Sequence, residues 1–161
     1  MPKMTFKEIR ERISEAPERV RVALEVGNRS GLMWEVTAPG FVAMVKALTV
    51  APQNPSQVYR LHAANSPNKV ALRWRDRSLT FSELDERMDR LAGGFTMRGI
   101  SRGSSVILMM RNRPEFIEIQ GGASRVGGAA VSTSWRSTAS ELVYVAAHSN
   151  AKMICFDHDL W

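Results

Sequence analysis

Cysteine is almost missing from this 161-residue sequence, and its single cysteine, Cys155, excludes a disulfide framework. The thiol lies in "AKMICFD", whose apolar run predicts a buried strand with the cysteine as a small core side chain. A lack of disulfides favours a reducing compartment, and the charged N-terminus "MPKMTFKEIRERISEAPERV" is unlike a signal peptide. We therefore expect a soluble, cytoplasmic protein.

A long uninterrupted hydrophobic run is missing as well. The most apolar window, residues 31–50, contains two charged residues and a Pro39-Gly40 break, so it is not expected to span a bilayer. A helix is predicted over residues 41–49, after that break. It either packs on the domain, which we favour, or lies in a lipid interface, which would make the protein peripheral to a membrane.

Runs of one charge sign are absent too, although the net charge is +6. Acidic and basic residues alternate along the chain without a Lys/Arg tract. This pattern favours a solvated basic surface, with a weak anion-attracting face as the alternative. We expect no nucleic-acid partner.

Motifs that would assemble an active site are not found. The glycines of "GGASRVGG" (121–128) fall inside and at the end of a predicted helix, so they indicate close helix–sheet packing and not a phosphate loop. There is no nucleophile elbow. The histidines are scattered, and "DHD" at 157–159 is predicted to be a solvated loop and not a metal site. The residues alone therefore predict no catalytic group and no metal site.

Two regions can be distinguished in what is present. Residues 1–52 form a helical N-terminal extension, and the turn-rich "APQNPS" marks the boundary to residues 53–161. Beyond it, "VALRWRDRSLT" predicts a hairpin that turns at Asp76-Arg77. Thr80 and Glu83 then form a capping box for an amphipathic helix that ends near Gly99.

The rest of the chain alternates apolar strands with helices. Residues 104–110, "GAAVSTS" and "AKMICF" are continuous apolar runs of strand length, and two helices lie between them. One helix opens at Pro114, and the other is capped by Thr138 and Glu141. We therefore predict an α/β fold of three layers, a mainly parallel sheet with helices on both faces.

The order of these segments resembles the N-terminal part of the adenylate-forming superfamily. "LTFSEL" (79–84) is similar to its first core motif, and "SRVGGAAVSTSWRSTASEL" to its second core segment. "RMDRLAGGFTMRGISRGSSVILMMRNRPEF" and "NAKMICFD" match the segments between and after them. The segment "VYRLHAANSPNKVAL" that leads into these motifs favours an AMP-forming acyl-CoA synthetase. The resemblance therefore implies a partial N-terminal lobe of the adenylate-forming fold.

The resemblance implies that the full enzyme uses ATP, Mg and coenzyme A to convert a carboxylic acid, most simply a fatty acid, into its CoA thioester. In such enzymes the loop after the second strand faces the coenzyme A channel, so Trp135 and Arg136 are the candidate cofactor contacts. The alternative is that Trp135 packs between lobes and Arg136 is solvated.

The family's phosphate loop and catalytic lysine do not occur in the 161 residues. We therefore expect the chain alone to be inactive and to bind none of these cofactors tightly. We expect its partner to be the remainder of the enzyme, in cis or in trans, with self-association through exposed apolar surface. A non-catalytic interaction module that retains the scaffold is the second hypothesis. A basic α/β nucleotide- or nucleic-acid-binding domain is the third, and the missing phosphate loop disfavours it.

Overall fold

The computed structural model describes residues 36–49 and 54–160 and five isolated helical positions, 18, 21, 22, 25 and 29. The other predicted helical residues before position 36 lie outside the described residues. Helix α2 (Ala38–Thr49) begins earlier than predicted, because the Pro39-Gly40 pair lies in its first turn. Proline is tolerated there since the first N–H groups of a helix have no intrahelical acceptor.

Helix α3 (Gln57–Asn65) follows and leads to an antiparallel hairpin of β1 (Val70–Trp74) and β2 (Arg77–Thr80). The hairpin was predicted, but its turn is Arg75-Asp76, one residue earlier than expected. Arg75 has a φ of 52°, in the left-handed region that a tight hairpin turn requires. The hairpin tip therefore carries a positive charge on a constrained backbone.

Helix α4 (Phe81–Met97) begins with the predicted capping box. The Thr80 N–H donates to Glu83 Oε2 at 2.8 Å, and the Glu83 N–H donates to Thr80 Oγ1 at 3.3 Å. Thr138 and Glu141 repeat this arrangement at the start of α6 (Ala139–His148). Gly99 follows α4 with a φ of +77°, so the predicted helix end is also confirmed.

The parallel sheet has the order β4-β3-β5 in the described part of the chain. Its strands are β3 (Ser105–Met109), β4 (Ala129–Ser132) and β5 (Ala151–Phe156), and β3 pairs in parallel with both neighbours. The first four residues of β3 are buried, which explains why the sequence of this strand is a continuous apolar run. The predicted parallel α/β architecture is confirmed.

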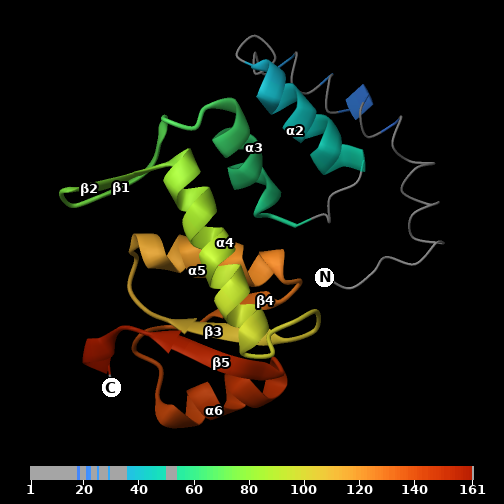
Figure 1. Ribbon diagram of the computed structural model, residues 1–161. Helices are drawn as coiled ribbons and strands as arrows, with labels where there is room; N and C mark the ends of the chain where they lie inside the picture. The colour runs from blue at the N-terminus through green and yellow to red at the C-terminus, as the bar shows by residue number, and fades with distance from the viewer. Residues whose placement is uncertain are drawn as a thin grey trace.

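Figure 1 shows the layers: α4 and α5 (Pro114–Arg125) cover one face of the sheet, and α6 covers the other. A short 3-10 helix, η2 (His158–Leu160), follows β5. The largest buried apolar cluster joins α4, the following turn, β3, β4 and α5. Its buried members are Phe95, Ile100, Val106, Leu108, Met110, Ile119 and Ala123. Cys155 packs at the edge of this cluster, and burial raises the pKa of its thiol.

The glycines of α5 allow close contact between two helices, and not the helix–sheet contact that was predicted. A Cβ on Gly121 would overlap the Met88 side chain, and one on Gly122 would lie 2.9 Å from Leu91 Cβ. Both neighbours belong to α4. The two helices therefore approach each other at positions where only glycine fits.

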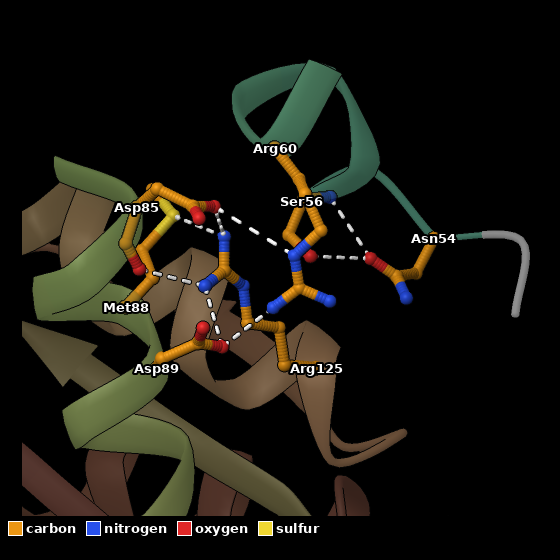
Figure 2. Close-up of polar contacts among 7 residues, drawn as sticks. All are labelled: Asn54, Ser56, Arg60, Asp85, Met88, Asp89 and Arg125. Carbon is orange, nitrogen blue, oxygen red and sulfur yellow. Dashed lines mark hydrogen bonds and ion pairs between the residues drawn. The ribbon is translucent and has the colours of Figure 1, made fainter. Parts of the chain in front are cut away.

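A buried arginine joins α5 to α4, and Figure 2 shows its partners. Arg125 donates from Nη1 to the Asp85 carbonyl at 2.7 Å and from Nη2 to the Asp85 carboxylate, and it also pairs with Asp89 at 2.7 Å. Arg60 of α3 reaches the same Asp89 carboxylate at 2.6 Å. We call these four side chains the helix cluster. It connects α3, α4 and α5.

Candidate functional site

An open cleft of about 570 Å³ lies where β3 and β5 end, beneath the tip of the hairpin. Ligands of open parallel α/β sheets bind outside the carboxyl ends of the strands, so its position is significant. We call it the carboxyl-edge cleft. Its lining residues are Trp74, Arg75, Arg111, Asn112, Arg113, Asp157, His158 and Asp159.

Asp157 organises the floor of this cleft. It directly follows β5, and its side chain is only 5% exposed. One carboxylate oxygen accepts the Arg111 backbone N–H at 2.9 Å, and the other accepts Arg113 Nη1 at 3.0 Å. Asp157 therefore ties the end of β5 to the segment that leaves β3.

The protonation states in this network are fixed by its contacts. The Arg111 backbone hydrogen bond, together with the Arg113 side chain, holds the pKa of Asp157 below its usual range. The Arg113 hydrogen bond likewise lowers the pKa of Glu115, and the two carboxylates raise the pKa of Arg113. All three groups are thus charged at neutral pH.

Two tryptophans stack against these arginines. The Arg111 guanidinium carbon lies 4.8 Å from the ring centroid of Trp135, and that of Arg113 lies 5.9 Å from Trp74. Arg75 covers Trp74 at 4.4 Å. Cation–π contacts of this kind hold flat aromatic surfaces next to positive charge.

Trp135 and Arg136 lie in the loop between β4 and α6, at the same edge of the sheet. Trp135 is half-buried and Arg136 is exposed, and the Arg136 guanidinium lies 4.4 Å from the Trp135 ring centroid. The Arg136 N–H donates to Ser134 Oγ at 3.1 Å, and the loop is closed by a 3.0 Å contact between the Thr133 and Ser137 hydroxyls. The backbone that carries the pair is thus ordered by its own side chains.

The chemistry at this edge suits a ligand with an aromatic ring and anionic groups. Arg111 binds Asp159 through both carboxylate oxygens, at 2.8 and 3.0 Å, so part of its charge is already neutralised. Arg75 and Arg136 are exposed at the two sides of the network. Guanidinium groups pair with phosphates, and tryptophan stacks on bases.

Comparison with known proteins assigns the family. A model described as "AMP-binding enzyme" matches residues 59–160, well over half of the chain. The chain belongs to the AMP-binding enzyme family. The matched stretch contains the hairpin, the sheet, the carboxyl-edge cleft and the Trp135–Arg136 loop.

Three relatives illustrate the likeness. A 4-hydroxybutyrate–CoA ligase 2 of Metallosphaera sedula is 32% identical over 90 residues, 56% of this chain and 16% of that protein. The solved fatty acyl CoA synthetase of Mycobacterium tuberculosis is 28% identical with a TM-score of 0.58. The match covers 64% of this chain and 21% of that one. The chain therefore spans a minor part of these ligases.

A third relative differs from these ligases in length. The uncharacterized protein Rv1549 of M. tuberculosis is 31% identical over 108 residues. That stretch makes up 66% of this chain and 62% of the relative, a much larger share than the match covers in the two ligases.

The structure brings the two predicted residues together with others that sequence reasoning missed. The Trp135 ring contacts both Arg136 and Arg111, and Arg111 comes from a loop 24 positions before Trp135. Arg113, Asp157 and Trp74 were not anticipated. The signal for the arginines was an Arg-x-Arg sequence directly after an apolar strand. No comparable signal linked Trp74 to this edge, because its place depends on how the hairpin folds over the sheet.

The "DHD" segment differs from the prediction of a solvated loop. Asp157 is buried, and Asp157 and Asp159 are both paired with arginine. Within the described ranges, no group of three or more His, Cys, Asp or Glu side chains is arranged to hold a metal ion.

Proposed function

We propose that this chain forms part of the N-terminal lobe of an AMP-forming acyl-CoA synthetase that activates a fatty acid with ATP and Mg and transfers the acyl group to coenzyme A. The observation that carries the proposal is the family match over residues 59–160. One of the solved relatives of the chain is a fatty acyl CoA synthetase. We further propose that residues 1–52 form an extension and that the lobe begins at residue 53. A reducing cytoplasm suits its single cysteine.

We propose that the Trp135–Arg136 loop contacts the nucleotide part of coenzyme A. Arg136 is exposed and held over the Trp135 ring, so its guanidinium is available to a phosphate, and adenine would stack on the indole in place of a guanidinium. Arg111 lies 4.8 Å from the centroid of the same ring and adds positive charge there. Binding by this chain alone is expected to be weak, because one loop and one cleft wall contribute to it.

A tryptophan fluorescence titration with coenzyme A and with 3′-dephospho-coenzyme A tests this assignment. Removing the Arg136 guanidinium in Arg136→Ala is expected to weaken coenzyme A binding about tenfold, because a charge-assisted hydrogen bond to phosphate is lost. Arg102→Ala is the matched control, since Arg102 is also an exposed loop arginine but precedes β3 at the opposite edge. Equal losses in the two variants would contradict the assignment.

Catalysis, in this proposal, requires the remaining lobes in cis or in trans. The phosphate loop and the catalytic lysine with which the family neutralises the charge developing during adenylyl transfer do not occur in the 161 residues. The 161-residue chain is expected to show no fatty-acid-dependent exchange of pyrophosphate into ATP. Co-expression with the remaining lobes of such a synthetase is expected to produce exchange. Exchange by the chain alone would refute the requirement.

A second candidate is a non-catalytic interaction module with the same scaffold. The uncharacterized M. tuberculosis relative favours it, because the match covers 62% of that relative. The co-expression experiment separates the two. A module is expected to bind an intact synthetase without restoring exchange to the incomplete lobes.

A further inference from the structure

The net positive charge of the chain is concentrated in one segment, which is an exception to the alternation of acidic and basic residues elsewhere. Residues 36–75 contain five basic side chains and no Asp or Glu, whereas residues 76–161 contain ten basic and ten acidic side chains. The segment therefore contributes five of the six net positive charges. We call it the basic segment. It contains α2, α3 and β1.

The basic side chains of this segment are exposed. They are Lys46, Arg60, Lys69, Arg73 and Arg75. Only Arg60 has a described ion pair among them, and Lys46, Lys69 and Arg73 have no carboxylate within 4.0 Å in the part of the chain that the structure describes. In Figure 1, α2, α3 and the hairpin occupy the end of the molecule opposite α6. The net charge is thus presented at one end.

The same segment exposes large apolar side chains. Phe41 and Val42 on α2, Val58 on α3 and Val70 on β1 are all exposed, and Val42 is the most exposed of them at 65%. Helix α2 contains no acidic residue, and Lys46 lies one turn beyond Val42. This surface combines apolar side chains with lysines. It differs from the carboxyl-edge cleft, where the arginines pair with carboxylates and lie against tryptophan rings.

The orientation of α2 is set by its contact with α3. A Cβ on Gly40 would overlap the Asn65 side chain, and Asn65 Oδ1 accepts the Thr37 N–H at 2.7 Å just before α2 begins. Ala43, Met44 and Ala47 are half-buried. The start of α2 is therefore fixed against the end of α3, which leaves Phe41 and Val42 on the outer side.

We infer that α2 docks in the plane of an anionic lipid surface, with Phe41 and Val42 in the interface and Lys46 and Lys69 beside the headgroups. An amphipathic helix with exposed apolar groups and nearby lysines binds such surfaces through apolar burial and electrostatic attraction. Helix α2 has 12 residues, and no described helix is long and apolar enough to cross a membrane. Three of the four exposed apolar side chains, Val42, Val58 and Val70, are aliphatic and fit acyl chains better than nucleic-acid bases, which bind aromatic platforms. Helix α2 precedes the family match, so the inference does not depend on the proposed function.

Co-sedimentation of the full chain with lipid vesicles tests the inference. The protein is expected to bind phosphatidylcholine vesicles containing about one third phosphatidylglycerol, to release them as salt is raised, and to bind pure phosphatidylcholine far less. Val42→Asp is expected to lower binding about tenfold, through loss of apolar burial and addition of a negative charge. Val143→Asp on α6 is the matched control, because Val143 is 69% exposed and lies at the opposite end.

A second pair of variants isolates the electrostatic part. Lys46→Glu is expected to reduce binding to the anionic vesicles about tenfold, whereas Lys152→Glu, an identical charge change on β5, leaves binding near the wild-type level. Thermal unfolding of all four variants establishes that they remain folded. The inference is overturned if the wild type does not bind, or if each variant and its control lose binding equally. It is also overturned if a short RNA binds in place of vesicles, or if Val42→Asp only converts a dimer to a monomer in light scattering.

Discussion

Two arginine–aspartate networks in this protein use the same side-chain chemistry in different surroundings. In the helix cluster, the Arg125 side chain is 5% exposed and lies between α3, α4 and α5. At the carboxyl-edge cleft, Arg111 is 44% exposed and Arg113 is 33% exposed, and their aspartate partners follow β5. The main difference is which partner is buried: the arginine in the helix cluster, and Asp157, which is also 5% exposed, at the cleft.

That difference separates a structural network from a candidate ligand site. The Arg125 Nη atoms are occupied by the Asp85 carbonyl and by two carboxylates, and its buried Nε has no partner among the described side chains. At the carboxyl edge, the carboxylates fix the arginines in place, but a cleft and two indole rings remain beside them. A buried arginine holds helices together, and a half-exposed arginine leaves its positive charge accessible to a ligand.

Replacing Arg125 is expected to have the largest effect on stability. Arg125→Met should lower the free energy of unfolding by about 3 kcal/mol, because it removes the buried partner of two carboxylates. The loss is limited because Asp89 is half exposed and still pairs with Arg60. Urea denaturation measures the change. Arg90→Met is the control, since the exposed Arg90–Glu86 pair at 3.7 Å should contribute less than about 0.5 kcal/mol. Equal effects of the two substitutions would mean that the helix cluster is not structural.

Replacing Asp157 is expected to have an intermediate effect that depends on pH. Asp157→Asn should cost about 1–3 kcal/mol at neutral pH, because two charge-assisted hydrogen bonds are weakened. The folded-state pKa of Asp157 is lowered, so its contribution is present above the unfolded-state value near 4 and is lost as pH falls through the folded-state pKa.

Urea denaturation as a function of pH measures this effect. The wild type and Asp157→Asn are expected to converge in stability in strong acid and to differ at neutral pH. A difference that is constant with pH would show that the Asp157 charge does not stabilise the edge network.

Replacing Arg60 is expected to have the smallest effect. Arg60→Met should cost less than about 1 kcal/mol, because the Arg60 side chain is partly exposed and forms a surface ion pair. The cost should increase in the Arg125→Met background, where Arg60 is the remaining cation near Asp85 and Asp89. A double-mutant cycle measures this coupling, and strictly additive effects would contradict a shared cluster.

Local features of the fold were predictable because a few neighbouring residues determine them. Both capping boxes, the Gly99 helix end and the three apolar strands are confirmed, as is the parallel sheet. The predicted start of α2 was three residues too late, and the predicted turn of the hairpin was one residue too late. Pro39-Gly40 was interpreted as a break although proline is also allowed in a first helical turn, and no local residue type indicated that Arg75 adopts a positive φ.

The candidate site was predictable only in part. Trp135 and Arg136 were selected through family resemblance, and their role remains a proposal. Asp157 was assigned to a solvated loop, because nothing in "DHD" indicates that its first carboxylate lies against an N–H that is 46 positions away. Contacts over such distances depend on which strands become neighbours.

The sequence alone determined the helices and strands, the parallel direction of the sheet strands and the family. Capping and periodicity depend on neighbouring residues, and the order of the motifs can be followed along the chain. The tertiary structure decided which charges meet. It buried Arg125 between three helices, placed Asp157 beneath Arg111 and Arg113, and gathered α2, α3 and β1, which contain no acidic residue, at one end. Burial and charge pairing depend on the positions of neighbouring elements, and these positions are fixed only when the helices pack on the sheet.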